Sequence, residues 1–297
     1  MNSGTRLVII LFILMTLFSY ALPNVAEWIA LMLMICAGIP HGSYDLRVAK
    51  AKWSSREISP AKIVAIYLVC VFLMSALCVF TPGIGLTLFL AISAIHFSEG
   101  EFQSSAPASL VSGVLFGIGA ILLPIGLHSD TSMQYLGYFV DPSTYELLAP
   151  KVRVLSLIVL VISSFIVARE CLRRLAPTET IIERCLCLFG WVLLPPLAGF
   201  CVWFIGRHSR QHLELCKTLF HSSQLKIPLD FAFISLLAIV GLLPFARIFD
   251  FSDINQLFAA SICLIAGLTL PHMIVSYNMR ACEQIKQHGN SQDILPQ

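Results

Sequence analysis

Long apolar segments follow one another along almost the whole chain, and no other feature of the sequence constrains the fold more. Each approaches or reaches the roughly 20 residues that a helix needs to cross the hydrocarbon core of a membrane. They lack the alternation of a membrane β-barrel, and only helices and closed barrels satisfy the backbone in lipid. The sequence therefore predicts an all-α, polytopic transmembrane helical bundle of about 8–10 spans. The segments cover residues 6–22, 26–40, 62–81, 84–97, 108–127, 152–170, 185–205, 229–248 and 256–275.

Composition supports a chain whose surface faces lipid. Of its 297 residues, 57% are hydrophobic and 12% are charged, and the mean hydropathy is +0.83. A soluble domain carries about 25% charged residues. The net charge of +2, without a basic patch, argues against a nucleic-acid partner. No polar domain separates the segments, so we expect a single transmembrane helical bundle over residues 1–282 and a polar cytoplasmic tail over residues 283–297.

The distribution of basic residues predicts the orientation. Lys and Arg gather after the second apolar segment, in residues 47–62, and after the sixth, in residues 169–184. The stretch from His128 to Pro150 contains neither, and is expected to be a long external loop. The positive-inside rule then predicts a multi-pass protein of the cell (inner or plasma) membrane with a cytoplasmic N-terminus.

This orientation creates a conflict, because simple alternation places His208 and His212 on the other side from His41 and His96. Pro195-Pro196 offers a solution, since prolines there break the apolar run and allow a re-entrant turn or two short helices. Histidines near the middle of the membrane are an alternative solution.

Five of the eight histidines lie at ends of apolar segments. Ionisable residues in such places are costly and usually serve function. If residues 208–212 are helical, His208 and His212 share one face and can present two nitrogens to one ion. We therefore predict one buried metal site. Its candidate ligands or site residues are these five, His41, His96, His208, His212 and His272, whereas His128, His221 and His288 are expected to face solvent.

Carboxylates follow two of these histidines and are expected to orient the imidazoles from behind: Asp45 after His41, and Glu99 and Glu101 after His96. Imidazole ligands suit zinc, copper, iron or nickel. An apolar cavity with this ligand set fits non-haem Fe(II) that reacts with O₂ on a lipid-soluble substrate, although zinc and copper also fit. The expected lining of the substrate cavity is Tyr44, Phe97 and Trp203.

At these residues the sequence resembles the Brp/Blh family of bacterial and archaeal membrane β-carotene 15,15′-dioxygenases. The resemblance implies an Fe(II) enzyme that cleaves the central double bond of β-carotene with O₂ to give two molecules of retinal. It also implies that His41, His96, His208 and His212 are the iron ligands, and that His272 belongs to the C-terminal Pro-His block. Four blocks carry it, in the same order and spacing: Pro40-His41-Gly42 with Asp45, His96-Phe97, His208-Ser209 with Arg210 and His212, and Pro271-His272.

The chain departs from the family pattern at four positions near these blocks. They are Tyr44 for a small or aliphatic residue, Ser98 for glycine, Glu101 for aspartate and Arg207 for an aromatic residue. These changes leave the ligands in place but alter their surroundings. The expected partners are a carotenoid, O₂, the lipid bilayer and a retinal-binding opsin. Two other functions are weighed against this one: a membrane desaturase or hydroxylase, which would have more clustered histidines, and a transporter, which would have repeated intramembrane polar residues.

Overall fold

The computed structural model describes residues 1–53, 58–101, 107–219 and 227–288, and within these ranges every regular element is helical. The elements are α1 (Ser3–Ala21), α2 (Pro23–Leu33), η1 (Met34–Gly38), η2 (Ile39–Tyr44), α3 (Asp45–Trp53), α4 (Pro60–Phe80), α5 (Pro82–Glu101), α6 (Pro107–Leu127), α7 (Ser129–Leu136), α8 (Pro142–Leu172), α9 (Thr178–Leu193), α10 (Pro196–Trp203), η4 (Phe204–Ser209), α11 (Arg210–Leu219), α12 (Ile227–Leu242), η6 (Leu243–Arg247) and α13 (Ile254–His288).

Proline and capping residues mark many helix starts. Proline is the first residue of α2, α4, α5, α6, α8 and α10, a position where its missing N–H costs nothing. Polar side chains cap three of the long helices: Asn2 accepts from the Thr5 amide, Ser59 from the Lys62 amide and Asp141 from the Thr144 amide. Such caps replace the absent backbone partners of the first turn.

Seven helices in the described residues are long and apolar enough to cross a membrane, which confirms the predicted helical membrane fold. Two of the nine predicted segments differ from the expectation. The segment 185–205 is divided between α9 and α10, and the segment 229–248 forms the shorter helix α12 and then the 3₁₀ turn η6 around Pro244. Proline at both places interrupts the backbone hydrogen bonding of an α-helix.

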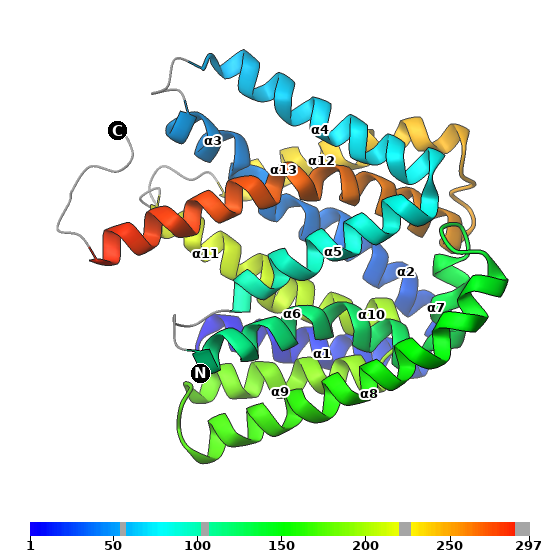
Figure 1. Cartoon of the computed structure of the whole chain (residues 1–297), viewed down its shortest axis with the longest axis vertical. Coiled ribbons are helices and arrows are strands. Elements are labelled where there is room, and N and C mark those ends of the chain that lie inside the picture. The colour runs from blue at the N-terminus through cyan, green and yellow to red at the C-terminus, as the bar shows by residue number, and fades with distance from the viewer. Residues whose placement is uncertain (54–57, 102–106, 220–226, 289–297) are drawn as a thin grey trace.

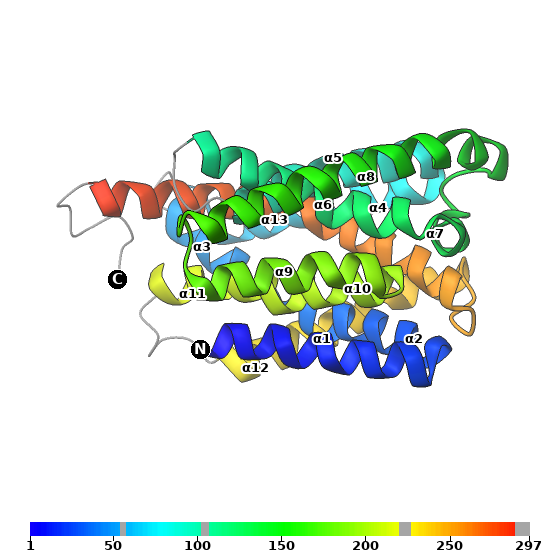
Figure 2. The ribbon, with the colours of Figure 1, turned by 90° about the horizontal axis from the view of Figure 1, so that it is seen from below.

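The helices pack in layers around a central pair. Figure 2 shows α9 and α10 between α1 and α2 on one side and α6 and α8 on the other, in agreement with their contacts. The long helices α4, α5 and α13 pack together on the far side of α6. In Figure 1 the start of α1 lies at the same end of the bundle as α3 and α11, whereas α7 lies at the opposite end.

The chain from α9 to α11 forms a hairpin that reverses at Leu194-Pro195, where the backbone is extended. Gly190 and Gly199 face each other across it, because a Cβ on Gly199 would lie 2.5 Å from the Gly190 carbonyl oxygen. Farther along the two arms, the Arg207 and Glu183 side chains are 2.7 Å apart. The predicted break at the prolines is therefore present, and the chain after it returns to the end at which α9 begins.

One expectation about a polar segment is wrong, and a second lies largely outside the described residues. The stretch from His128 to Pro150 is no long loop, because α7 and the first turns of α8 occupy most of it. The polar tail over residues 283–297 stays a prediction: α13 continues into it as far as His288, and residues 289–297 lie outside the described residues.

Candidate metal centre

His41 projects from an irregular stretch of helix. The π-helical turn η1 passes into the 3₁₀ turn η2, which contains Pro40 and His41. Such interruptions of an α-helix are frequent at functional sites because they redirect side chains. The His41 ring is buried, and its Nδ1 donates a hydrogen bond to the Gly38 carbonyl oxygen. The remaining ring nitrogen, Nε2, therefore faces the interior of the bundle.

His272 is held by a carboxylate from the other end of the sequence. It follows Pro271 inside α13, and its Nδ1 lies 2.9 Å from both oxygens of Asp45, the first residue of α3. The Tyr67 hydroxyl of α4 donates to the same carboxylate at 3.0 Å. A carboxylate behind an imidazole fixes its tautomer and orientation. Asp45 thus has the expected orienting position, but it orients His272 rather than His41.

The other three histidines come from α5 and from the returning arm of the hairpin. His96 lies near the end of α5, His208 in the second π-helical turn η4, and His212 one turn later in α11. All three are buried. The ring centroids of neighbouring histidines in the cluster are 4.6–5.4 Å apart: His41 contacts His208, His212 and His272, His96 contacts His208 and His272, and His212 contacts His272.

The facing nitrogens of this cluster fit a metal ion. His41 Nε2 and His272 Nε2 are 3.1 Å apart. Both Nδ1 atoms already donate hydrogen bonds, so each neutral ring turns a lone pair toward the other. A cation accepts both lone pairs, and adjacent nitrogens about 2.1 Å from one metal are about 3 Å apart. His41, His96 and His272 each offer a ligand atom within 4.8 Å of the others, and so do Asp45, His212 and His272.

An apolar cavity of about 510 Å³ adjoins the cluster, within the usual size range of ligand pockets. Four histidines lie at one end of it, His41, His96, His208 and His272, and α7 residues including Tyr135 lie at the other. Four apolar lining side chains are more than a third exposed on the outside of the bundle: Leu46, Val64, Leu68 and Leu237. The cavity thus opens sideways between α4 and α12, near the level of the histidines.

The three residues expected to line the cavity have different positions. Phe97 lines it. Tyr44 is fully buried outside it and donates to Asp230 at 3.0 Å. Trp203 is also fully buried behind His208, on whose ring it stacks with centroids 5.3 Å apart. An aromatic residue next to a histidine in sequence can support that histidine as readily as it can line the cavity.

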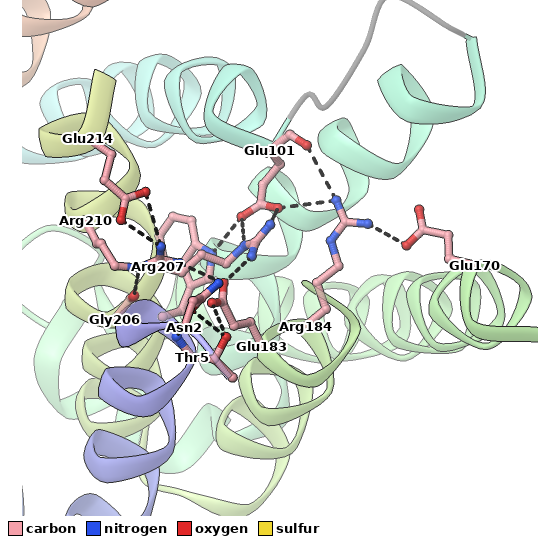
Figure 3. A network of polar contacts seen from close by, with 11 residues as sticks. Asn2, Thr5, Glu101, Glu170, Glu183, Arg184, Gly206, Arg207, Arg210 and Glu214 are labelled. Carbon is pink, nitrogen blue, oxygen red and sulfur yellow. Dashed lines mark hydrogen bonds and ion pairs between the residues drawn. The ribbon is translucent and has the colours of Figure 1, made fainter. Parts of the chain in front are cut away.

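Glu99 and Glu101 do not share the position of Asp45. Glu99 is half-buried, one turn after His96. Glu101 is buried in a network of ionic contacts, where it accepts from both Arg207 and Arg184 (Figure 3). Burial raises the pKa of the Glu101 carboxyl, and the Arg207 and Arg184 guanidinium groups outweigh it, so the pKa lies below its ordinary value. Two of the departures from the family pattern, Glu101 and Arg207, are therefore partners.

The remaining histidines lie outside the cluster or outside the description. His128 is half-buried rather than solvent-facing, and its Nε2 lies 3.0 Å from the Trp191 carbonyl oxygen. His221 and the side chain of His288 lie outside the described residues. Sequence reasoning also missed Tyr67 and Arg184. Only the rarity of polar groups within or beside an apolar segment could have indicated them.

Comparison with known protein families matches residues 32–280 to the family described as β-carotene 15,15′-dioxygenase. The chain belongs to this family. The predicted resemblance is thereby confirmed, and the protein is an oxygenase. The matched residues include the whole histidine cluster, from His41 to His272.

A protein named β-carotene 15,15′-dioxygenase from the uncultured marine bacterium 66A03 is 27% identical over 265 residues, which cover 84% of this chain and 92% of that protein. No solved structure matches the chain.

Proposed function

We propose that this enzyme cleaves the central 15,15′ double bond of β-carotene, or of a related carotenoid, with O₂ to give retinal. The observation that carries the proposal is the buried histidine cluster at one end of an apolar cavity, in a chain of the β-carotene 15,15′-dioxygenase family. The reaction balances without a reductant: the C=C bond breaks, and each of its two carbons receives one oxygen atom of O₂ as an aldehyde.

We propose Fe(II) as the metal. His41, His96, His208 and His212 would hold it, together with His272, whose Nε2 faces that of His41 at 3.1 Å. An all-imidazole set suits iron, as it also suits copper and zinc, and cleavage with O₂ favours iron. When bound there, Fe(II) supplies the activation of O₂.

The chain itself supplies placement and a dry surrounding. Phe97 and the aliphatic side chains of α5, α6 and α13 line the cavity, and would hold a long polyene with its central bond beside the histidines. Holding reactants in a productive geometry lowers the barrier by itself. Asp45 accepts a hydrogen bond from Nδ1 of His272, so that Nε2 of the same ring faces the other histidines of the cluster.

We further propose a multi-pass protein of the cell membrane, with its N-terminus in the cytoplasm. The N-terminal ammonium lies 4.0 Å from Glu179, in the same stretch as Arg173, Arg174 and Arg184. A cytoplasmic position of this basic stretch would agree with the positive-inside rule. The substrate would come from the bilayer, and a retinal product would suit a retinal-binding opsin as the next partner.

Expression in a bacterium that accumulates β-carotene tests the reaction. The wild-type chain is expected to remove the orange colour and to form retinal. His41→Ala or His208→Ala should lower retinal formation by roughly 100-fold or more. Removal of a residue that only hydrogen-bonds to a metal ligand already lowers activity by about 10- to 100-fold, and removal of the ligand itself has a larger effect. Retinal is measured by chromatography, and iron is measured in the purified proteins. His128→Ala removes a histidine outside the cluster and is the matched control.

Three outcomes would contradict the proposal in different ways. Persistent β-carotene with a metal-loaded wild-type protein would exclude this substrate. A hydroxylated or desaturated carotenoid in place of retinal would favour another membrane oxidoreductase. A wild-type protein without iron, or iron content unchanged in both histidine variants, would exclude the metal centre.

A further inference from the structure

Figure 3 shows a buried ionic network. It adjoins the histidine cluster, because Arg207 immediately precedes His208 and Glu101 lies five residues after His96. Its inner members are two acids, Glu101 and Glu183, and two cations, Arg184 and Arg207, all at most 4% exposed in their side chains. The charges of this inner set balance. Burying an ion pair is no better for stability than packing apolar residues of similar volume. A stability role alone therefore does not explain why the network is present.

Arg207 makes three short hydrogen bonds to the two inner acids. It immediately precedes His208 in η4, and its guanidinium binds Glu101 through two parallel hydrogen bonds, Nε to Oε1 at 2.6 Å and Nη2 to Oε2 at 2.8 Å. Its third nitrogen, Nη1, donates to Glu183 Oε2 at 2.7 Å. A two-bond contact between guanidinium and carboxylate sets direction as well as distance. The backbone at position 207 is thus held on two sides.

Glu101 connects Arg207 with the helix of a second histidine, His96, and with the aromatic ring that stacks on His208. It is the last residue of α5, five positions after His96. Its Oε1 also accepts from Trp203 Nε1 at 3.4 Å, and the Trp203 ring stacks on the His208 ring. The same carboxylate therefore contacts the residue before His208 and the aromatic ring behind it.

The outer contacts fix the network to three more helices. Glu183 of α9 accepts from the Thr5 hydroxyl of α1 at 3.0 Å and from Arg210 Nη2 of α11 at 2.8 Å. Arg184 donates to Glu170 of α8 at 2.6 Å. The Glu101–Arg207 pair is thus anchored to the helices around it and cannot shift freely with α5 or η4 alone.

We propose that Glu101 and Arg207 are positioning residues of the metal centre, which set the spacing between His96 on α5 and His208 on η4. The ring centroids of these two histidines are 4.9 Å apart. The inference rests on the proposed function, because it concerns the metal held by the same histidines. Neither residue lines the cavity, so each acts through the histidines and not on the substrate.

Co²⁺ binding tests this inference without carotenoid or O₂, because the visible absorption of Co²⁺ reports its coordination. The double variant Glu101→Leu/Arg207→Met removes both charges and leaves neither one buried alone, so it should fold. Arg207→Lys keeps the charge but loses the two-bond geometry. Each is purified in detergent and titrated with Co²⁺, and its thermal unfolding is recorded. Glu214→Gln, at the 51% exposed rim of the network, is the control.

We expect both variants to unfold near the wild-type temperature, to bind Co²⁺ at least about tenfold more weakly, and to give an altered absorption spectrum, as when a group behind a metal ligand is lost. The control should match the wild type. If the double variant does not fold, Arg207→Lys decides. The proposal would be overturned if Arg207→Lys, or a folded double variant, showed the Co²⁺ affinity and absorption spectrum of the wild type. It would also be overturned if neither Arg207→Lys nor the double variant folded. A wild-type protein that binds no Co²⁺ at its histidines would overturn the proposed metal centre and this inference with it.

Discussion

Asp45 serves a histidine that lies 227 positions away in the sequence. Its two oxygens receive the Nδ1 proton of His272 and the Tyr67 hydroxyl, and its side chain is almost completely buried. Both oxygens of this buried carboxylate accept a hydrogen bond, so its direction is well determined. The direction of the His272 ring, and of its Nε2, follows from that of the carboxylate.

We expect Asp45→Asn to weaken metal binding by roughly 10- to 100-fold, the usual effect of losing a carboxylate behind a metal-bound imidazole. The amide is uncharged, and its nitrogen cannot accept the His272 proton. Titration of the purified variant with Fe²⁺ or Co²⁺ measures the change. Tyr67→Phe, which keeps the carboxylate and removes one donor, should give a smaller effect. Unchanged affinity in Asp45→Asn would show that Asp45 does not orient a ligand.

The histidine cluster was predictable from sequence to the extent that its residues are costly in an apolar setting. His41, His96, His208, His212 and His272 all lie together, as expected of one site. Their partners were less predictable, because a carboxylate near a histidine in sequence need not meet that histidine in space. Two carboxylates show this: Asp45 contacts His272, and Glu101 contacts Arg207.

At the scale of elements, one π-helical turn lies just before His41 and a second one contains His208. The turn η1 ends three residues before His41, and η4 contains His208. A π turn adds a residue to the helical repeat and so changes which face later side chains occupy. Phe204 of η4 packs edge-on against His41, which brings the two irregular turns together. No apolar pattern in the sequence indicates such turns, and they were not predicted.

The hairpin formed by α9 and α10 requires glycine where its arms cross. We expect Gly199→Ala to force the arms apart, because its Cβ would lie 2.5 Å from the Gly190 carbonyl oxygen. Overpacking of this kind costs about 1–3 kcal/mol, and the displaced arm carries His208. The temperature of thermal unfolding and the affinity for Co²⁺ should therefore both be lower than in the wild type.

Gly119→Ala is the matched control for this variant. A Cβ at Gly119 would meet its nearest atoms at 3.6 Å, which is ordinary contact. If Gly199→Ala has the same Co²⁺ affinity and the same unfolding temperature as Gly119→Ala, the close approach of the two arms does not position His208. The break itself was predictable, since two consecutive prolines cannot continue a helix, but the close approach of the glycines depends on the tertiary packing.

At the scale of the whole molecule, the cavity connects the histidines with the outer surface of the bundle. Its exposed lining residues on α4 and α12, such as Leu68 and Leu237, are 60% and 47% exposed. On a helix that crosses a membrane, such side chains meet lipid. We infer that an apolar substrate reaches the histidines from the bilayer between α4 and α12.

We expect Leu68→Trp and Leu237→Trp to narrow this opening and to raise KM for β-carotene by roughly three- to tenfold, with kcat and metal affinity little changed, because binding and not chemistry is affected. Initial rates in mixed micelles at several β-carotene concentrations give both constants. Val161→Trp, on a 66% exposed position of α8, is the control. An unchanged KM in both variants would place the entry route elsewhere.

The two histidines that face each other come from the second apolar segment and from the last one, with His41 in η2 and His272 in α13. A chain emerging from the ribosome inserts its N-terminal segments first. The nitrogen that faces His41 is thus supplied only when the final helix has entered the bundle. Under the proposed function, a chain that stops before α13 would keep His41, His96, His208 and His212 and would lack His272. Metal content would then report whether α13 has packed against the segments that were inserted before it.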